Sequence, residues 1–140
     1  MKKFALETFA LSHDGVLEML RAAVACAEQI GQPQCIVIVD ASGEPLAEIR
    51  MTGAKYLSRL SARTKARTAA STGAPSDAIP EAVRSQIADA TQGGVTGLPG
   101  GLPIFLNKTL VGGIGVGSGS PEQDIHVAKA GLAAINATVR

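Results

Sequence analysis

The sequence predicts an α+β domain in which helices flank an antiparallel sheet of about five strands. Two pairs of apolar segments, within residues 34–51 and 102–119, are each divided by a short polar turn, which is typical of β-hairpins. Segments with helical spacing of apolar residues lie before, between and after these pairs. Strands joined by hairpins run antiparallel, so the helices are expected to cover the sheet. The 140 residues suit one such domain, residues 1–140.

The first part of the chain predicts one helix followed by one hairpin. Ser12 or Thr8 is placed to cap the helix, and Gly31 is placed to end it. Its expected buried face comprises Val16, Met19, Leu20, Ala23, Val24, Ala27 and Ile30. Residues 34–40 (QCIVIVD) form a continuous apolar run, as expected of a strand covered on both faces. Residues 46–51 return after a polar turn as the second strand of this hairpin.

The middle of the chain predicts a second helix and a second hairpin. Residues 55–72 are rich in Ala, Arg, Lys and Leu, which favour a helix, and Gly73 follows as its C-cap. A short helix is expected within 76–90, and the glycine-rich loop after it is expected to hold one short strand at 94–97. Residues 102–119 then form the second hairpin, across the turn Asn-Lys.

The last helix has the clearest start signal in the sequence. Ser120 stands at the N-cap, Pro121 at the first helical position, and Gln123 three residues after the cap. A Ser with a Gln at this spacing is a capping box, in which each side chain bonds the other's backbone N–H. The expected buried stripe comprises Ile125, Ala128, Leu132 and Ile135.

Composition excludes several classes of function. Apolar residues make up 46% of the chain and aromatic residues only 3%, so the core is expected to be aliphatic. The net charge is +1 with both signs interspersed, and aromatic residues are not interleaved with basic ones, which argues against nucleic acid and anionic membrane as partners. No apolar run of signal-peptide length follows the basic start, so a cytoplasmic protein is expected. Cys26 and Cys35 are expected to be reduced and buried, and no metal site is predicted.

A run of glycines precedes the last helix, in the segment GGIGVGSG (112–119). Its spacing fits neither the G-x-G-x-x-G dinucleotide fingerprint nor a Walker A loop. The glycines at 113, 115, 117 and 119 instead alternate, which leaves one face of a strand without side chains. Two interpretations remain open: a helix packs unusually close to this face, or a flat ligand approaches the backbone there. The N-terminus of the following helix could then bind an anion.

Four segments occur in an order that resembles the GlcG/HbpS-like family, also called the haem-degrading-domain family, which includes the C-terminal domain of PduO-type proteins. They are RMTGA (50–54), KARTAA (65–70), GGLPI (100–104) and GGIGVGSGSPEQD (112–124). The resemblance extends from about residue 12 to the end of the chain, and the glycine strand followed by S-P-E-Q-D is its most specific part.

The resemblance implies a profilin-like or roadblock-like sheet flanked by helices, and assembly into homo-oligomers, often octamers. It also implies haem as a possible ligand, since some members of the family bind haem, while no cofactor is required. One position departs from the family pattern. The family commonly has Asp in its R-M-D-G-A segment, and this chain has Thr52 there.

Arginines are the first candidates for ligand contacts. Arg59, Arg63 and Arg67 repeat every four residues on the second helix, with Lys55 one turn earlier, so the four cations lie on one stripe. Either this stripe is a solvated face, which could contact acids of another subunit, or some of these arginines bind a carboxylate, for which the guanidinium fork is well shaped. Arg50, at the end of a strand and next to a loop, is a further candidate.

The glycine strand and the last helix supply the remaining candidates. The backbone of Gly101, Gly115, Gly117 and Ser118 is expected to line a bound ligand. Asp124 could accept a proton, and His126, two residues further on, could act as a base or be an ordinary surface histidine. His13 and Glu122 have sufficient structural explanations, the first as a surface residue and the second as an acid in the first turn of a helix.

These observations support three hypotheses of function. The leading one is a small oligomeric protein that binds haem or another anionic carboxylate ligand, as an accessory to a catabolic pathway. The alternative is a cofactor-independent tautomerase or isomerase acting on a hydroxymuconate-like or oxo-acid substrate. In that enzyme arginines such as Arg59 would hold carboxylates, and Asp124 or His126 would move the proton. The third is an assembly subunit whose surface arginines contact another protein.

Overall fold

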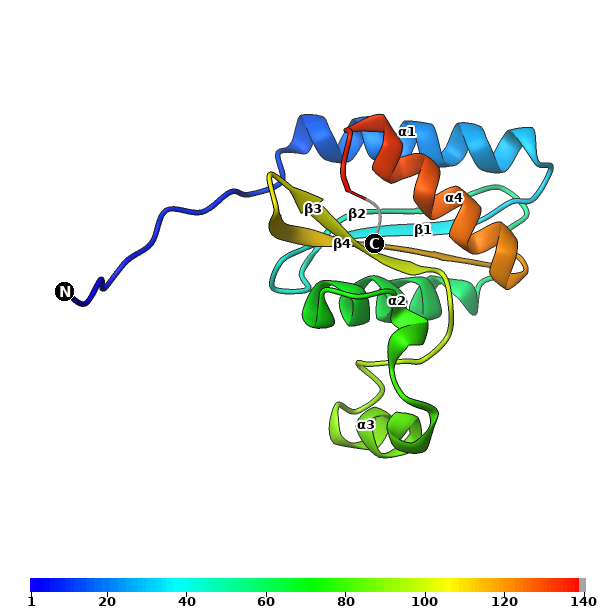
Figure 1. The fold of residues 1–140 in the computed structure, drawn as a ribbon. Helices are drawn as coiled ribbons and strands as arrows, with labels where there is room; N and C mark the ends of the chain where they lie inside the picture. The colour runs from blue at the N-terminus through cyan, green and yellow to red at the C-terminus, as the bar shows by residue number, and fades with distance from the viewer. Residues whose placement is uncertain (139–140) are drawn as a thin grey trace.

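A four-stranded antiparallel sheet forms the centre of the molecule. The computed structural model describes residues 1–138, and the strand order is β2-β1-β4-β3 (Figure 1). The strands are β1 (Cys35–Asp40), β2 (Pro45–Arg50), β3 (Gly101–Leu106) and β4 (Thr109–Gly117). Every neighbouring pair is antiparallel, with Val37 opposite Glu48 on one side of β1 and Gly115 on the other. Both predicted hairpins and the predicted α+β class are confirmed.

The strand expected at residues 94–97 does not form, so the sheet has four strands. The backbone N–H of Thr96 donates to the side-chain oxygen of Thr68, at 3.0 Å. This segment therefore lies against a helix, and its backbone is not available to a neighbouring strand.

Helices cover both faces of this sheet. Helices α1 (His13–Gln29) and α4 (Pro121–Ala134) lie on one face and α2 (Ser58–Thr72) on the other, as Figure 1 shows. The short helix α3 (Arg84–Ala90) lies beyond α2. No helix within residues 1–138 combines the length and apolarity that crossing a membrane requires.

The two faces carry cores of different size. Under α1 and α4, large aliphatic side chains are completely buried, among them Met19, Ile36, Ile38, Ile104, Ile114 and Leu132. Under α2 the core is thin: Cys35, Val37 and Val39 of β1 meet Ala62, Ala66 and Ala70 of the helix. Small residues on α2 let the helix approach the sheet closely, and this close approach explains why β4 has glycines on the face beneath the helix.

Helix α2 occupies the bare face of β4. A Cβ atom added at Gly113 or Gly115 would collide with the backbone carbonyl of Ala66 or Ala62, and one added at Gly101 with that of Lys65. Gly117 faces Ser58 and Ser61 at the start of the same helix. The interpretation of Gly101 and Gly115 as ligand-lining positions is therefore wrong, because the helix backbone already fills the space in which a ligand would lie. At Gly117, Ser58 and Ser61 occupy that space.

Helix starts and ends follow the local signals, except at the start of α2. Ser120 and Gln123 form the predicted capping box, and Gly73 ends α2 in the left-handed conformation at φ 68°. Ser12, and not Thr8, caps α1 by accepting from the N–H of Gly15 at 3.1 Å. Helix α2 begins at Ser58, because residues 55–57 form a turn.

The predicted helix within 76–90 is divided. Two 3₁₀ turns, Ser76–Ala78 and Glu81–Val83, precede α3, and Pro80 lies between them. Proline lacks the N–H that a continuous helix would need at this point and disfavours helical geometry in the residue before it.

Candidate functional site

The three arginines of α2 face the β1–β2 hairpin, and each has its own partner. Arg63 forms an ion pair with Glu48 of β2, with Nε 2.7 Å from the carboxylate oxygen Oε1. Arg67 donates from Nε to the carbonyl of Gly43 in the hairpin turn, at 2.9 Å. The guanidinium of Arg59 lies 4.3 Å from the centre of the Tyr56 ring. The stripe predicted from the sequence is therefore real, but its members contact different groups and do not form one anion clamp.

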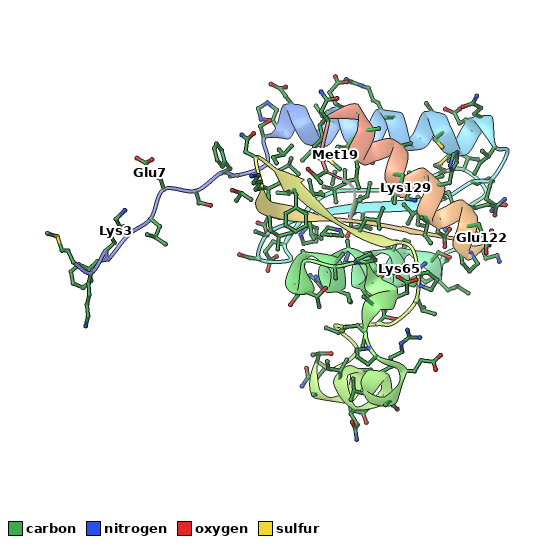
Figure 2. The ribbon with its side chains drawn as sticks, viewed as in Figure 1. Lys3, Glu7, Met19, Lys65, Glu122 and Lys129 are labelled. Atoms are coloured by element: carbon green, nitrogen blue, oxygen red, sulfur yellow. The ribbon has the colours of Figure 1, made fainter. Side chains whose placement is uncertain are left out.

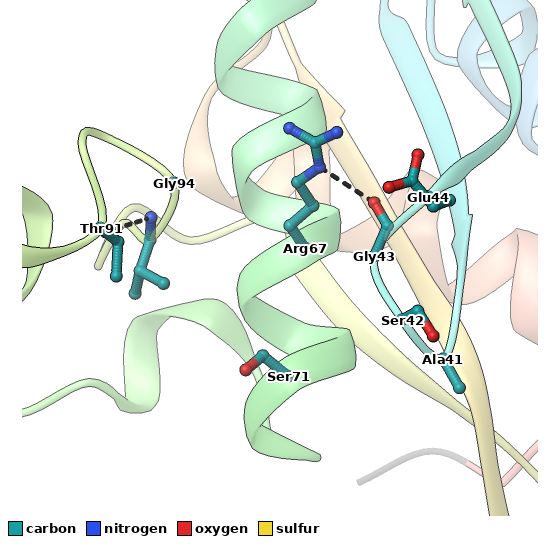
Figure 3. A pocket seen from close by; sticks show the side chains of 9 residues that line it. Ala41, Ser42, Gly43, Glu44, Arg67, Ser71, Thr91 and Gly94 are labelled. Carbon is teal, nitrogen blue, oxygen red and sulfur yellow. Dashed lines mark hydrogen bonds between the residues drawn. The ribbon is translucent and has the colours of Figure 1, made fainter.

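A hollow of about 380 Å³ lies between the hairpin turn, α2 and the loop around residue 94 (Figure 3). Figure 3 shows the Arg67 guanidinium bonded to the carbonyl of Gly43, with Glu44 beyond it on the same hairpin. The carboxylate of Glu44 contributes a negative charge to the same rim. This hollow is therefore of mixed charge and does not select anions.

A second hollow, of about 200 Å³, lies on the α2 side of the sheet at its β2 edge. Its lining includes Cys35, Glu48, Arg50 and Arg59. Cys35 stands directly opposite Arg50 in the β1–β2 register, so both side chains are on the face that α2 covers. Glu48 is already paired with Arg63. Across residues 1–138 neither Arg50 nor Arg59 forms an ion pair, and the hollow thus has two guanidinium groups available to an anion. We call it the Arg50–Arg59 hollow.

The thiol of Cys35 is a neutral part of this hollow. Burial raises its pKa above the ordinary value, and the positive charges of Arg50 and Arg59 oppose that rise only in part. The residue is almost completely buried, and its sulfur lies 3.6 Å from the carbonyl of Lys55 as a hydrogen-bond donor. A protonated, inaccessible thiol is a poor nucleophile and a poor metal ligand.

Asp124 is part of a buried ion pair that sequence reasoning missed. Its carboxylate lies 3.2 Å from Nζ of Lys65, and both side chains are less than one-tenth exposed. Figure 2 labels Lys65 on α2. Oδ1 of Asp124 also accepts from the N–H of Gly119 at 3.0 Å, and Lys65 donates to the carbonyl of Val116 at 2.8 Å. The pair thus joins α2, the end of β4 and the start of α4. Lys65 falls within the KARTAA segment, so that segment was the available signal.

Burial raises the pKa of Asp124 above its ordinary value of 3.8, although Lys65 and the Gly119 hydrogen bond oppose the rise. The buried amide of Gln34 lies beside this carboxylate and was also missed from the sequence. His126, two residues after Asp124, is exposed. Residues two apart on a helix do not face each other, and neither Asp124 nor His126, the two alternative candidates for moving a proton, lines the Arg50–Arg59 hollow.

The other sequence candidates have structural contacts or are exposed. The Ser118 hydroxyl accepts from the backbone N–H of Lys55 at 2.9 Å, and its carbonyl accepts from the Gln32 amide at 2.9 Å. Ser118 therefore ties the end of β4 to the segments before α2 and β1. His13 is exposed and lies 3.6 Å from Asp14. Within the described part of the chain, no three His, Cys, Asp or Glu side chains are grouped as metal ligands would be.

Fold and site together define a three-layer α+β domain with a cationic hollow at the edge of its sheet. The chain belongs to the HbpS-like haem degrading protein family, whose model matches residues 11–133. The resemblance proposed from the glycine strand and the S-P-E-Q-D segment is thereby confirmed.

Relatives of known sequence and structure agree with this assignment. The chain is 36% identical over 132 residues to the corrinoid adenosyltransferase PduO of Salmonella typhimurium. This match covers 91% of this chain but only 39% of the length of that relative. A crystal structure of a PduOC:haem complex has 32% identity and a TM-score of 0.87, covering 94% of this chain and 99% of that one. A double mutant of Streptomyces reticuli HbpS has 30% identity and a TM-score of 0.83, covering 95% and 92% of the two chains.

Proposed function

We propose that this protein binds an anionic small molecule through the Arg50–Arg59 hollow, and that haem is that ligand. The observation that carries the proposal is the pair of guanidinium groups without an acidic partner at the edge of a 200 Å³ hollow. An arginine fork matches a carboxylate in shape and charge, and such charge-assisted bonds are stronger than neutral ones. Haem carries two propionate groups and therefore presents the required anions.

The hollow fits the propionate end of haem and not the ring. A volume of about 200 Å³ accommodates a carboxylate group with its short stem but is too small for a porphyrin. Two side chains in or beside this hollow are of types that ligate haem iron. Tyr56 is exposed and stacks on Arg59, whereas Cys35 is buried and protonated. Arg50 and Arg59 would thus orient the ligand, and the Tyr56 hydroxyl would be the group that contacts the iron. A bound haem would supply a redox-active iron.

The test separates the carboxylate contacts from the iron contact. Haemin titration, followed by the Soret band, is compared with titration of iron-free protoporphyrin IX, which keeps both propionates. Replacing Arg50→Gln or Arg59→Gln is expected to raise the Kd of both porphyrins about tenfold, since a hydrogen bond to a charged group contributes about 1.5–3 kcal/mol. Arg21→Gln on α1, on the opposite side of the sheet, is the matched control. Unchanged affinity in both hollow variants would refute the proposal.

Tyr56→Phe tests the proposed iron contact separately. The variant keeps the aromatic ring beside Arg59 and removes only the hydroxyl. We expect protoporphyrin IX to bind as it does to the parent protein, while the Soret position of bound haemin shifts. An identical haemin spectrum would exclude Tyr56 as the iron ligand and leave the propionate contacts to be judged by the arginine variants.

The role that we propose is that of an accessory binding protein in a catabolic pathway, acting as a homo-oligomer such as an octamer. The match covers 39% of the length of the Salmonella typhimurium PduO, and the ligand-binding role proposed here concerns that part alone. In the alternative, a tautomerase or isomerase, arginines such as Arg59 would hold the substrate while Asp124, His126 or a bound water moves the proton. Asp124 is buried in its pair with Lys65 and His126 is exposed on α4, so neither lines the Arg50–Arg59 hollow, and we favour the binding protein.

A further inference from the structure

The hollow beside Arg67 is lined by two opposite charges that do not pair with each other. It is the hollow of about 380 Å³ between the β1–β2 turn, α2 and the loop around residue 94 (Figure 3). Arg67 and Glu44 both line it, and across residues 1–138 neither side chain forms an ion pair. Within the same residues Arg67 bonds only through Nε, so both of its terminal nitrogens are available. We call this surface the Arg67–Glu44 hollow.

The turn between β1 and β2 fixes where the two charged residues stand. The carbonyl of Gly43 accepts from Nε of Arg67 at 2.9 Å, and Glu44 is the next residue in the chain, so the two are near neighbours. The carboxylate of Asp40 accepts from the backbone N–H of Ser42 at 2.9 Å and from that of Glu44 at 3.0 Å. The charge of Asp40 is thus stabilised within the turn, and the rim of the hollow is arranged before a ligand arrives.

The loop that forms the far wall is also anchored. Within it, the N–H groups of Gly94 and Val95 donate to the backbone carbonyl and the side-chain oxygen of Thr91, at 3.0 and 3.1 Å. The N–H of Thr96 donates to the Thr68 side chain of α2 at 3.0 Å. A volume of about 380 Å³ lies at the lower end of the range of small-molecule sites, which is about 300–1,000 Å³. The hollow is therefore a preformed space suited to a small ligand.

The pair of charges determines which kind of ligand is suited. An anion bound to Arg67 also meets the carboxylate of Glu44, and a cation bound to Glu44 also meets the guanidinium group. A zwitterion satisfies both groups, because it presents an opposite charge to each. The hydroxyls of Ser42 and Ser71 line the same hollow, and a hydroxyl can donate to a carboxylate or accept from an ammonium group. The lining therefore favours a zwitterion over an ion of either sign.

The short distance along the rim favours a compact zwitterion. A free α-amino acid carries its ammonium and carboxylate groups on a single carbon atom, so its two charges are as close as those of the rim. Its carboxylate matches the terminal nitrogens of an arginine, and its ammonium group offers three donors to a carboxylate and a hydroxyl. A longer ω-amino acid would have to fold to meet both groups.

We infer that the Arg67–Glu44 hollow binds a free α-amino acid, with its carboxylate on Arg67 and its ammonium group on Glu44. The hollow shares no lining residue with the Arg50–Arg59 hollow. The inference therefore goes beyond the proposed function and does not depend on haem binding.

Calorimetric titration of the full chain with matched small molecules tests the class of ligand. The probes are glycine, L-serine and L-leucine, together with acetate and methylammonium, each of which carries one of the two charges of glycine. We expect saturable binding of at least one amino acid, with a Kd at least tenfold below those of acetate and methylammonium, since each single-charge probe loses a charge-assisted bond. If none of the three amino acids binds, or if acetate binds as tightly as the best of them, the inference is overturned.

Substitutions on the rim test where the amino acid binds. Glu44→Gln and Arg67→Gln are each expected to raise the Kd of the bound amino acid at least tenfold. Glu18→Gln, on α1 at the opposite side of the sheet, is the matched control and should leave it unchanged. Glu44→Gln should also tighten the binding of acetate, because the repelling carboxylate is removed, and local damage to the turn would not have this effect. An amino-acid affinity that is unchanged by Glu44→Gln refutes the site.

Discussion

Replacing Gly115 by alanine tests whether the close approach of α2 determines the glycine pattern of β4. A Cβ atom at this position would collide with the carbonyl of Ala62 and would lie 2.6 Å from the backbone nitrogen of Ala66. Ordinary contact begins near 3.4 Å, so relieving the Ala66 contact alone would move the helix by about 0.8 Å from the sheet, and the closer Ala62 carbonyl requires a larger movement. The atoms in the way are backbone, and no rotamer change can relieve the contact.

The expected cost follows from two opposing effects. Overpacking a close-packed interface costs up to about 3 kcal/mol, and moving α2 also loosens Ala62, Ala66 and Ala70 from the sheet. Alanine recovers about 0.5–1 kcal/mol because it has less backbone freedom to lose than glycine. We therefore expect Gly115→Ala to lower the free energy of unfolding by about 2 kcal/mol, which corresponds to a decrease in Tm of roughly 6 °C for a domain of this size.

Urea unfolding followed by circular dichroism at 222 nm, at one fixed protein concentration, measures this change. Gly15→Ala is the matched control, because its Cβ would meet Leu11 at an ordinary 3.4 Å and alanine favours the helix. This control is expected to be neutral or slightly stabilising. A Gly115→Ala protein as stable as the parent would show that α2 does not need a bare strand, and the packing argument would be wrong.

Three further predictions concern the start of α4. Lys65→Met is expected to lower the free energy of unfolding in urea by about 3–5 kcal/mol, because it leaves Asp124 charged and buried, whereas Lys65→Met combined with Asp124→Asn recovers most of the loss. The folded-state pKa of Asp124 is raised, so its contribution to stability is complete below the ordinary value of 3.8 and is lost as the pH rises through the raised pKa. The parent protein should therefore gain stability relative to Asp124→Asn as the pH falls from 7 to 4, and a constant difference would contradict the shift. Ser120→Ala removes the cap hydrogen bond to Gln123 and should cost about 1 kcal/mol in thermal unfolding, with Ser42→Ala in the hairpin turn as an exposed control.

Much of the fold could be predicted because its signals are local. The capping box at Ser120, the turn between β3 and β4 and the helical spacing of Val16 to Ala27 act over a few residues, so the sequence shows them directly. The strand expected at residues 94–97 does not form, because the side-chain oxygen of Thr68, far away in the sequence, accepts a hydrogen bond from the backbone N–H of Thr96. The helix predicted within 76–90 is divided at Pro80, because proline cannot continue the helical hydrogen bonds there.

The candidate site was predicted less completely than the fold. Arg50 and Arg59 were identified as ligand contacts and do border one hollow, while Arg63 and Arg67 have partners within the chain. Spacing along α2 shows that cations share a face, but it does not show which acid or carbonyl lies opposite each one. Those partners come from the β1–β2 hairpin, whose register against α2 is a property of the packed structure.

The sequence by itself determined the class of fold, the family, the helix caps and the alternation that leaves one face of β4 without side chains. Only the tertiary structure decided what fills that face and what Asp124 does. Lys65 and Asp124 are 59 positions apart, and Gly115 meets Ala62 across the sheet–helix interface, so neither contact has a local sequence signal. The physical reason is that periodicity and capping act along the chain, whereas close packing and the burial of charge depend on which segments fold together.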